Sequence, residues 1–359
     1  DSLSVVLADI YPIGALGFGE EAAVLIDRLV VDVVYGNSLT CGDCGPYNDG
    51  TQWIYAITQS SGAGSPGLPS ELIYTTDGGA NWTEATITGI GATEDALAIE
   101  IIGQYVVVLG LDAIFYAEIN SDTGVPGTFT KITTGFVAAG SPTDIYVASP
   151  REVFFCGDGG YLYKSTDITA GVSVLSAGDV TSDDLNRIAG NESTIVAVGD
   201  NGATVVSTNR GVTFATATTE PETATLQAVT VTTDKTWWVG TGGGNLYYTL
   251  DGGASWTPKA FSGSAAGQVR DIISFGEDVI FFSHSTAAPA AQIFSSWDGG
   301  ANFTYQKPRL LNLPVFDYAN RLAMPQAADI SVAANNLAVA GLAGNGTDGI
   351  LLLGIAGTL

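Results

Sequence analysis

Short apolar runs alternate with glycine-rich turns along most of the chain. Residues 153–165 are VFFCGDGGYLYKS, and residues 195–207 (IVAVGDNGATVVS) and 237–249 (WWVGTGGGNLYYT) repeat the order of apolar run, turn and apolar run. Apolar runs of this length bounded by Gly, Asp and Asn are typical of strands joined by tight turns. The pattern therefore predicts antiparallel hairpins, and the scarcity of helix-forming Lys, Met and Arg agrees with this.

Each hairpin lies inside a longer repeat. An apolar stretch such as DIYVAS (residues 144–149) precedes the hairpin, and a β-branched run such as ATITGI (residues 85–90) follows it. Between the hairpin and the last run stands a box with the frame Ser/Thr-x-Asp-x-Gly-x-x-Trp. Clear and degenerate copies of the box are spaced 43, 47, 42, 42 and 47 residues apart. The spacing is measured between their first positions, which are Thr75, Glu118, Ser165, Ser207, Thr249 and Ser296. A single period of this length predicts one domain rather than two.

The period predicts the fold class. Four antiparallel strands in about 42 to 47 residues are typical of a propeller blade. We expect an all-β protein, a seven-bladed β-propeller of four-stranded antiparallel blades that spans residues 1–359, with six or eight blades as alternatives. The N-terminal segment 1–30 is expected to complete the last blade or to form a docking arm, since a closed ring leaves no open sheet edge. Residues 306–326 break the period and are expected to form an excursion between blades, before three more strands in residues 329–359.

The box and its surroundings resemble known families. The frame, best seen in YTTDGGANW (residues 74–82) and YTLDGGASW (residues 248–256), resembles the Asp-box of bacterial neuraminidase repeats. The fuller phrase VGTGGGNLYYTLDGGASW (residues 239–256) is similar to blades of photosystem II stability and assembly factor-like propellers. The resemblance covers residues 50–310 and implies a fold. It does not imply one function, because the same box occurs in sialidases, xyloglucanases, sorting receptors, assembly factors and virion proteins.

Turn chemistry accounts for the box residues. An Asp or Asn can accept backbone N–H bonds across the tight turn, the glycines allow positive φ, and the aromatic residue can fill the gap between blades. We therefore predict a structural role for all of them. They are Thr75, Asp77, Gly79 and Trp82; Ser207, Asn209, Gly211 and Phe214; Thr249, Asp251, Gly253 and Trp256; and Ser296, Asp298, Gly300 and Phe303.

Charge narrows the choice of partner. The chain has 37 acidic and 12 basic residues, a formal net charge of −25. Nucleic acids and anionic membranes are bound through Lys and Arg, so neither is an expected partner. No apolar run is long enough to predict membrane insertion. A protein partner, a larger assembly or a glycan remains.

Carboxylates recur where each innermost strand is predicted to begin. These residues are Asp95, Asp144, Asp184, Asp271 and Asp329, with Thr225 in the corresponding position of one repeat. In a propeller they would form an acidic ring at one mouth of the central channel. Two interpretations stay open: Asp begins strands by bonding to the preceding turn, or the ring binds a cation such as calcium or a basic peptide. No other cofactor is expected, and no residue set predicts a metal site.

Catalytic constellations are incomplete. A sialidase-like site needs three converging arginines, and only Arg187 and Arg270 fall on predicted innermost strands, with Arg321 in the excursion. A glycoside hydrolase with two carboxylates is an open alternative. His284 is the only histidine, so any Ser-His-Asp hypothesis depends on it. We predict no catalytic residue.

The positions of the three cysteines indicate little about function. Cys41 and Cys44 form CGDC in a predicted glycine-rich loop, and Cys156 lies in a predicted strand. Three residues are too few for a disulfide framework. The pair in CGDC is open to four interpretations: no chemistry, a small disulfide, a redox role or a metal site.

These observations predict a non-catalytic binding or structural propeller exposed on a surface. The expected location is extracellular or on a virion, for example as a structural or decoration protein of a tailed phage. The alternatives are a secreted glycoside hydrolase or glycan-binding protein, and an assembly factor for a membrane protein complex. The assembly factors that the sequence resembles carry an arginine-rich partner surface, and no arginine cluster occurs here.

Overall fold

The computed structural model describes the repeated body of the chain and parts of both ends. The described residues are 3–4, 6–7, 32–33, 39–44, 54–58, 69–76, 81, 83–92, 94–191, 193–261, 267–286, 291–306, 318–323, 337–344 and 349–356. They form short strands and two 3-10 turns, η1 (Asp158–Gly160) and η2 (Asp200–Gly202), with no α-helix in these ranges. The protein is therefore all-β over its described part.

Six four-stranded sheets are antiparallel throughout and follow one another along the chain. The first two contain β4 (Leu39–Cys44), β5 (Ile54–Thr58), β6 (Glu71–Thr75) and β7 (Thr83–Thr86), then β8 (Ala98–Ile102), β9 (Tyr105–Leu109), β10 (Ile114–Glu118) and β11 (Thr130–Ile132). The next two contain β12 (Pro142–Ser149), β13 (Glu152–Gly157), β14 (Tyr161–Ser165) and β15 (Ser173–Ala177), then β16 (Leu185–Gly190), β17 (Ile195–Gly199), β18 (Thr204–Ser207) and β19 (Ala215–Thr216). The last two contain β20 (Leu226–Val231), β21 (Trp237–Thr241), β22 (Leu246–Thr249) and β23 (Thr257–Lys259), then β24 (Gly267–Phe275), β25 (Val279–Thr286), β26 (Ala291–Ser296) and β27 (Thr304–Gln306).

A further four-stranded sheet joins the two ends of the chain. Its order is β2-β30-β29-β28, with β28 (Tyr318–Ala323), β29 (Leu337–Gly344), β30 (Gly349–Ala356) and the short β2 (Val6–Leu7). β2 runs parallel to β30, so this sheet is mixed. Near it, β1 (Leu3–Ser4) pairs with β3 (Asp32–Val33).

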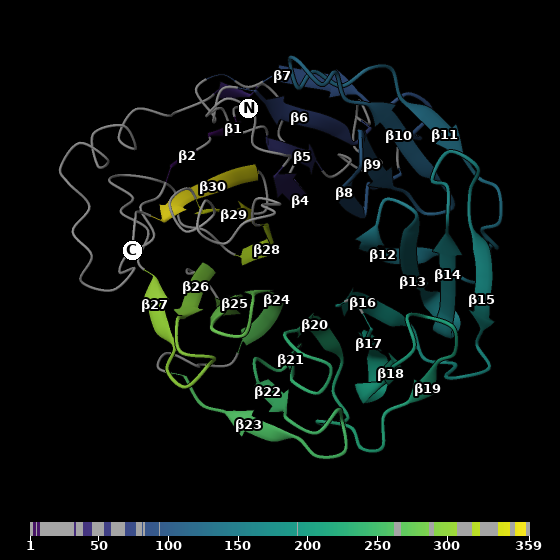
Figure 1. Ribbon diagram of the computed structural model, residues 1–359. Coiled ribbons are helices and arrows are strands. Elements are labelled where there is room, and N and C mark those ends of the chain that lie inside the picture. The colour runs from purple at the N-terminus through teal and green to yellow at the C-terminus, as the bar shows by residue number, and fades with distance from the viewer. Residues whose placement is uncertain are drawn as a thin grey trace.

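The sheets are arranged around a centre in the order of the sequence (Figure 1). The first strand of each sheet, from β4 to β28, lies toward the centre, and the last strand, such as β11, β15 or β23, lies at the outer rim. Each sheet therefore has a neighbour on both faces. This explains why every residue of β17 is buried. In a strand with one face exposed to solvent, buried and exposed residues would alternate.

Two segments differ from their sequence-based predictions. Within the predicted excursion 306–326, residues Tyr318–Ala323 form β28, the innermost strand of the mixed sheet, while 307–317 and 324–326 lie outside the described residues. The register of β28 shifts between Ala319 and Leu322, which hides the alternation expected of a strand. CGDC does not form a loop: Cys41 and Cys44 lie on β4 and pair with residues of β5. Ladder pairing there outweighs the turn preference of glycine and aspartate.

The innermost strands share an irregularity that ties neighbouring sheets together. The register shifts between Pro142 and Asp144 in β12, and the same shift occurs at the start of β16, β20 and β24. The extra residue projects toward the next sheet. Thr143 Oγ1 donates to the carbonyl of Leu185, and Asn186 Nδ2 donates to the carbonyl of Leu226 at 3.2 Å. These β-bulges therefore fix the walls of the central channel.

Candidate functional site: the channel, its mouth and the box turns

The described box turns use their polar atoms internally. Thr249 Oγ1 donates to Asp251 Oδ1 at 2.7 Å and accepts the N–H of Gly253 at 3.0 Å. Asp251 Oδ1 also accepts the backbone N–H of Ser255 at 2.8 Å. The hydrogen bonds from Ser255, followed by that from Thr249, lower the pKa of Asp251 to about 2. Both carboxylate oxygens thus serve the turn.

The other boxes repeat this geometry with different side chains. Ser296 Oγ donates to Asp298 Oδ1 at 2.7 Å, and Asp298 accepts the N–H of Asn302 at 2.8 Å. The bonds from Asn302 and Ser296 lower the pKa of Asp298 to about 2. In the copy with Asn209, the amide oxygen accepts the N–H of Thr213 at 2.9 Å. An amide therefore replaces the carboxylate without loss of the turn.

The box glycines and aromatic residues also serve local structure. Gly253 and Gly300 have φ of 80° and 82°, in the left-handed region that favours glycine. Trp256 packs against Trp237 at 6.3 Å between ring centroids, and its Nε1 donates to the carbonyl of Thr219 at 3.0 Å. Phe303 lies edge-on to Trp238 at 5.6 Å.

The remaining box residues are placed as follows. Gly211 has φ of 72° and Phe214 is half-buried against the core between the sheets of β12 and β16. Ser207 accepts the N–H of Gly211 at 2.8 Å. Thr75 is buried at the end of β6, whereas Asp77, Gly79 and Trp82 lie outside the described residues.

The predicted acidic ring is divided between two levels. Asp144 and Asp271 follow the bulges of β12 and β24 and are 4% and 6% exposed, inside the channel. Asp184 precedes β16 and is exposed at the mouth, and Asp95 precedes β8. Asp144 follows the bulge residue Thr143 of its strand, whereas Asp184 precedes the bulge residue Asn186, so the two aspartates are not at equivalent positions. Asp329 lies outside the described residues.

A cavity of about 270 Å³ lies between five innermost strands. Its polar lining includes Glu100, Asp144, Arg187, Thr230, Asp271 and Ser274. Asp144 Oδ2 accepts the N–H of Ile188 at 3.0 Å, and the hydroxyls of Thr230 and Ser274 are 2.7 Å apart, so these side chains also link neighbouring strands. Glu100 was not among the predicted site residues, although a single charge within the apolar run AIEII is a signal that marks it.

Carboxylates gather at the mouth where innermost strands begin. We name Asp158, Asp183, Asp184, Asp200 and Glu222 the mouth cluster. Asp158 and Asp200 open η1 and η2, and the other three lie on the connections that enter β16 and β20. The pKa of Asp158 is raised, first by burial and then by the neighbouring charges of Asp184 and Asp200. The potential at this mouth is therefore negative.

Donors from the surrounding turns hold the mouth cluster in place. Asp184 Oδ1 accepts the N–H of Gly159 at 2.7 Å, and Asn186 Nδ2 donates to Asp200 Oδ1 at 3.0 Å. Glu222 Oε2 accepts from the hydroxyl of Tyr247 at 3.0 Å and from Asn245 at 3.1 Å. Gly159 lies on the sheet before β16, and Asn186 lies on the same sheet as the turn of Asp200. Asn245 and Tyr247 lie on the sheet that the connection with Glu222 enters, so these three carboxylates have fixed positions.

Glycines allow the turns of the mouth to pack beneath the connections between sheets. Gly160 and Gly202 have φ of 73° and 79°. A Cβ at these positions would lie 1.8 Å from the carbonyl oxygen of Thr181 and 2.1 Å from that of Glu222. No side chain fits there, so the mouth surface depends on backbone contact.

The residues considered for catalysis do not converge. His284 is buried on β25 against Phe261 and Phe294, and it is not part of the cavity lining. Arg187 lines the channel cavity, and Arg270 does not. Arg321 lies on the innermost strand β28 and not in an excursion. The prediction that only Arg187 and Arg270 lie on innermost strands was therefore wrong. The bulge in β28 had hidden the strand pattern in the sequence.

The cysteine and metal chemistry of the described residues is limited. Cys156 is a buried free thiol whose Sγ lies 3.3 Å from Thr143 Oγ1. Within the described ranges, no group of three or more His, Cys, Asp or Glu side chains is arranged to hold a metal ion.

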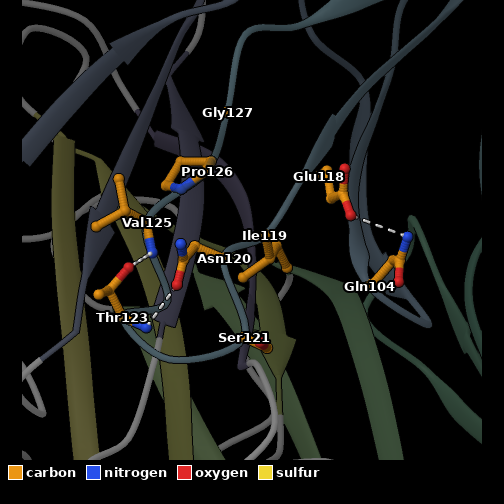
Figure 2. A pocket seen from close by; sticks show the side chains of 9 residues that line it. All are labelled: Gln104, Glu118, Ile119, Asn120, Ser121, Thr123, Val125, Pro126 and Gly127. Atoms are coloured by element: carbon orange, nitrogen blue, oxygen red, sulfur yellow. Dashed lines mark hydrogen bonds between the residues drawn. The ribbon is translucent and has the colours of Figure 1, made fainter.

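A second, open cavity of about 730 Å³ lies beside the connection between β10 and β11 (Figure 2). This connection stands where other sheets have a box turn. The hydroxyl of Tyr55 donates to the carbonyl of Gly124 at 2.6 Å, and Asn120 Oδ1 accepts the N–H groups of Asp122 and Thr123 at 3.0 Å. At the other side, Gln104 bonds to Glu118 at 3.1 Å. The loop shapes an exposed, mainly polar hollow.

Solved structures of similar shape are propellers. YCF48 bound to D1 peptide is 15% identical, the match covers 91% of this chain and 94% of that chain, and the TM-score is 0.64. YCF48 from Cyanidioschyzon merolae is 12% identical, with 90% and 97% coverage and a TM-score of 0.63. Virginiamycin B lyase from Staphylococcus aureus, as its selenomethionine form, is 12% identical, with 90% and 96% coverage and a TM-score of 0.63.

The fold and these comparisons define the protein as an all-β propeller. The resemblance to photosystem II assembly factor propellers holds at the level of fold, since YCF48 is one of them. No family model matches the sequence, and a search of curated proteins gives no match. Among the described residues, no helix has the length and apolar character needed to span a membrane.

Proposed function

We propose that this protein is a non-catalytic propeller that binds a basic segment of a partner protein at the channel mouth. The mouth cluster carries this proposal, because its five carboxylates lie on turns and connections of successive sheets, and Asp184, Asp200 and Glu222 accept hydrogen bonds from fixed donors. Preorganised charge of one sign attracts the opposite charge and fixes its position.

The nature of the ligand follows from the arrangement of the charges. Burial and then the repulsion from Asp184 and Asp200 raise the pKa of Asp158, and a cation bound between the three carboxylates would relieve this repulsion. The described part of the chain has no group of three metal-ligating side chains, which favours a Lys or Arg side chain over calcium. The likeness to YCF48 bound to D1 peptide is compatible with a peptide ligand.

The experiment compares two triple variants that change net charge equally. Asp158→Asn with Asp184→Asn and Asp200→Asn removes charge at the mouth but keeps an oxygen acceptor at each position. Asp112→Asn with Asp122→Asn and Asp278→Asn removes charge at exposed positions elsewhere. Titration with an oligolysine peptide is expected to show about tenfold weaker binding for the mouth variant and less than about threefold for the control. Equal weakening in both variants would contradict a localised site.

An enzyme remains a second candidate because the similar structures include a lyase. A polysaccharide-cleaving function would use the channel carboxylates Asp144 and Asp271. A screen of oligosaccharide cleavage separates the candidates: turnover by the native protein that is lost in Asp144→Asn would replace the binding proposal. The role of a tailed-phage component, expected from the sequence, has no support in these comparisons and is not part of the proposal.

We further propose that the mixed sheet is the seventh blade and that β2 closes the ring. β28 belongs to the set of innermost strands, and β2 pairs with β30 through Val6 and Leu7. A strand from the opposite end of the chain is the usual device that protects the last sheet edge of a propeller.

A further inference from the structure

The outermost strands differ in how well they resist pairing with another chain. β7 carries Glu84, β11 carries Lys131, and β23 carries Pro258 and Lys259. β19 and β27 are only 2 and 3 residues long. Charges, proline and shortness are features that keep edge strands from pairing, and a β-bulge is another. Apart from a bulge at Leu175, β15 differs from these strands in the first three features, since it is 5 residues long with the sequence SVLSA.

Exposed apolar side chains accompany this edge. Val174 and Leu175 on β15 are 41% and 37% exposed, and Val137 on the connection before β12 is 38% exposed. Val174 is paired with Tyr163, and the backbone of Val137 bonds to the same Tyr163. The three side chains therefore lie around one part of the rim, where Figure 1 shows β15 on the outside of its sheet.

The ladder leaves part of β15 available. Its register with β14 passes from Leu162–Ser176 to Tyr163–Val174, so Leu175 is a bulge residue without a ladder partner. As the last strand of its sheet, β15 also directs backbone groups outward. An added strand would satisfy these groups and cover the exposed valine and leucine.

Charge selects the occupant. Asp179 is exposed two residues after β15, where its Oδ1 accepts the N–H of Ala177 at 2.8 Å. Asp167 is exposed in the turn that leads into β15, where its Oδ1 accepts from the N–H and the hydroxyl of Thr169. The net charge of −25 opposes pairing with a second copy of this chain. Basic residues at the ends of an extended segment would complement both carboxylates.

We propose that β15 is a strand-addition site for an extended segment of a partner protein, with alternating apolar residues and a basic residue at each end. The site is on the rim and does not depend on the mouth cluster. It therefore provides a second contact surface, and either proposal can fail without the other.

The test uses the full chain and a synthetic peptide of alternating valine and threonine with a lysine at each end. Hydrogen exchange of residues 173–177 is expected to slow on addition of the peptide. The same peptide with N-methylated amides is expected to give no protection, because it lacks the backbone donors. Leu175→Lys is expected to weaken binding about tenfold, since it places a positive charge against the peptide lysines and removes an apolar contact. Thr216→Lys on β19 adds the same charge to another edge strand and is expected to bind as the native protein does.

Four outcomes would overturn the proposal. They are no slowing at 173–177 at the highest soluble peptide concentration, equal protection by the methylated peptide, equal weakening by Thr216→Lys, and concentration-dependent dimerisation that Leu175→Lys abolishes. The last outcome would assign the edge to a second copy. Melting temperatures of both variants verify that each is folded, and retained oligolysine binding by Leu175→Lys separates this site from the mouth.

Discussion

Arg210 occupies a backbone conformation that L-residues adopt only at a cost. Its φ is 59°, at the position where the boxes of Asp251 and Asp298 have Gly252 and Gly299. A non-glycine residue there is strained by about 1 kcal/mol. Arg210 also forms an ion pair with Glu152 at 2.8 Å, and its side chain is 59% exposed, so the pair contributes at most about 1 kcal/mol.

These two effects predict different free energies of unfolding for two substitutions of Arg210. Arg210→Gly relieves the strain and loses the ion pair, so its free energy of unfolding is expected to stay within about 0.5 kcal/mol of the native value. Arg210→Ala keeps the strain and loses the ion pair, and is expected to be about 1 kcal/mol less stable than Arg210→Gly. Urea unfolding measures both values. Equal stability of the two variants would show that the left-handed conformation is not strained.

Asp251 predicts how stability depends on acid. Its pKa of about 2 in the folded protein lies below the ordinary value near 4 of an unfolded chain, so its ionised form favours folding. This contribution is fully present above about pH 4 and is lost as the pH falls toward 2. Asp251→Asn is expected to lower the melting temperature above about pH 4 and to reduce its fall between pH 4 and 2. Asp278→Asn serves as a control for removal of an exposed turn aspartate, and melting curves across this range provide the measurement.

At the scale of elements, the glycine turns of the mouth connect one sheet to the next. Gly202→Ala would place a Cβ 2.1 Å from the carbonyl oxygen of Glu222 at a φ of +79°. We expect it to lower the free energy of unfolding by about 2 to 3 kcal/mol. Gly243→Ala is the matched control: its Cβ would have no contact closer than 3.6 Å, so it should change stability by less than about 0.5 kcal/mol. Chemical denaturation of the two variants distinguishes backbone contact from a general effect of glycine replacement.

The hairpins and box turns could be predicted because their signals are local. Asp251 and its neighbours bond within a few residues, so the motif contains its own explanation. The innermost strands are different, because bulges shift their register and their contacts lie on other sheets. Asp144 and Asp184 looked equivalent in sequence, but the ladder register places Arg187 at the position of Asp144, so Asp184 lies before its strand. The strand β28 was mistaken for an excursion. The partners of Glu222 come from residues more than 20 positions away, and no local pattern indicates them.

At the scale of the whole molecule, the pairing of β2 with β30 predicts the effect of deleting the N-terminal residues. Deletion of residues 1–20 removes β2 and exposes the outer edge of β30. We expect a lower melting temperature and concentration-dependent aggregation, because an unprotected edge pairs with other chains. Sedimentation and thermal melting measure both effects. A monomeric truncation with an unchanged melting temperature would assign this segment to an external arm instead.

The pairing of β2 with β30 also places the two ends of the chain in one sheet. Val6 lies opposite Leu352 and Leu7 opposite Leu353 in a parallel pair, so a crossover connection of about a dozen residues could join the end of β30 to the start of β2. New ends could then be opened in a surface turn, such as that around Gly243, whose Cβ position has ordinary packing distances. Such a circular permutant should keep every sheet but move the point of entry into the ring. The same propeller could then form from a chain whose termini lie in another sheet.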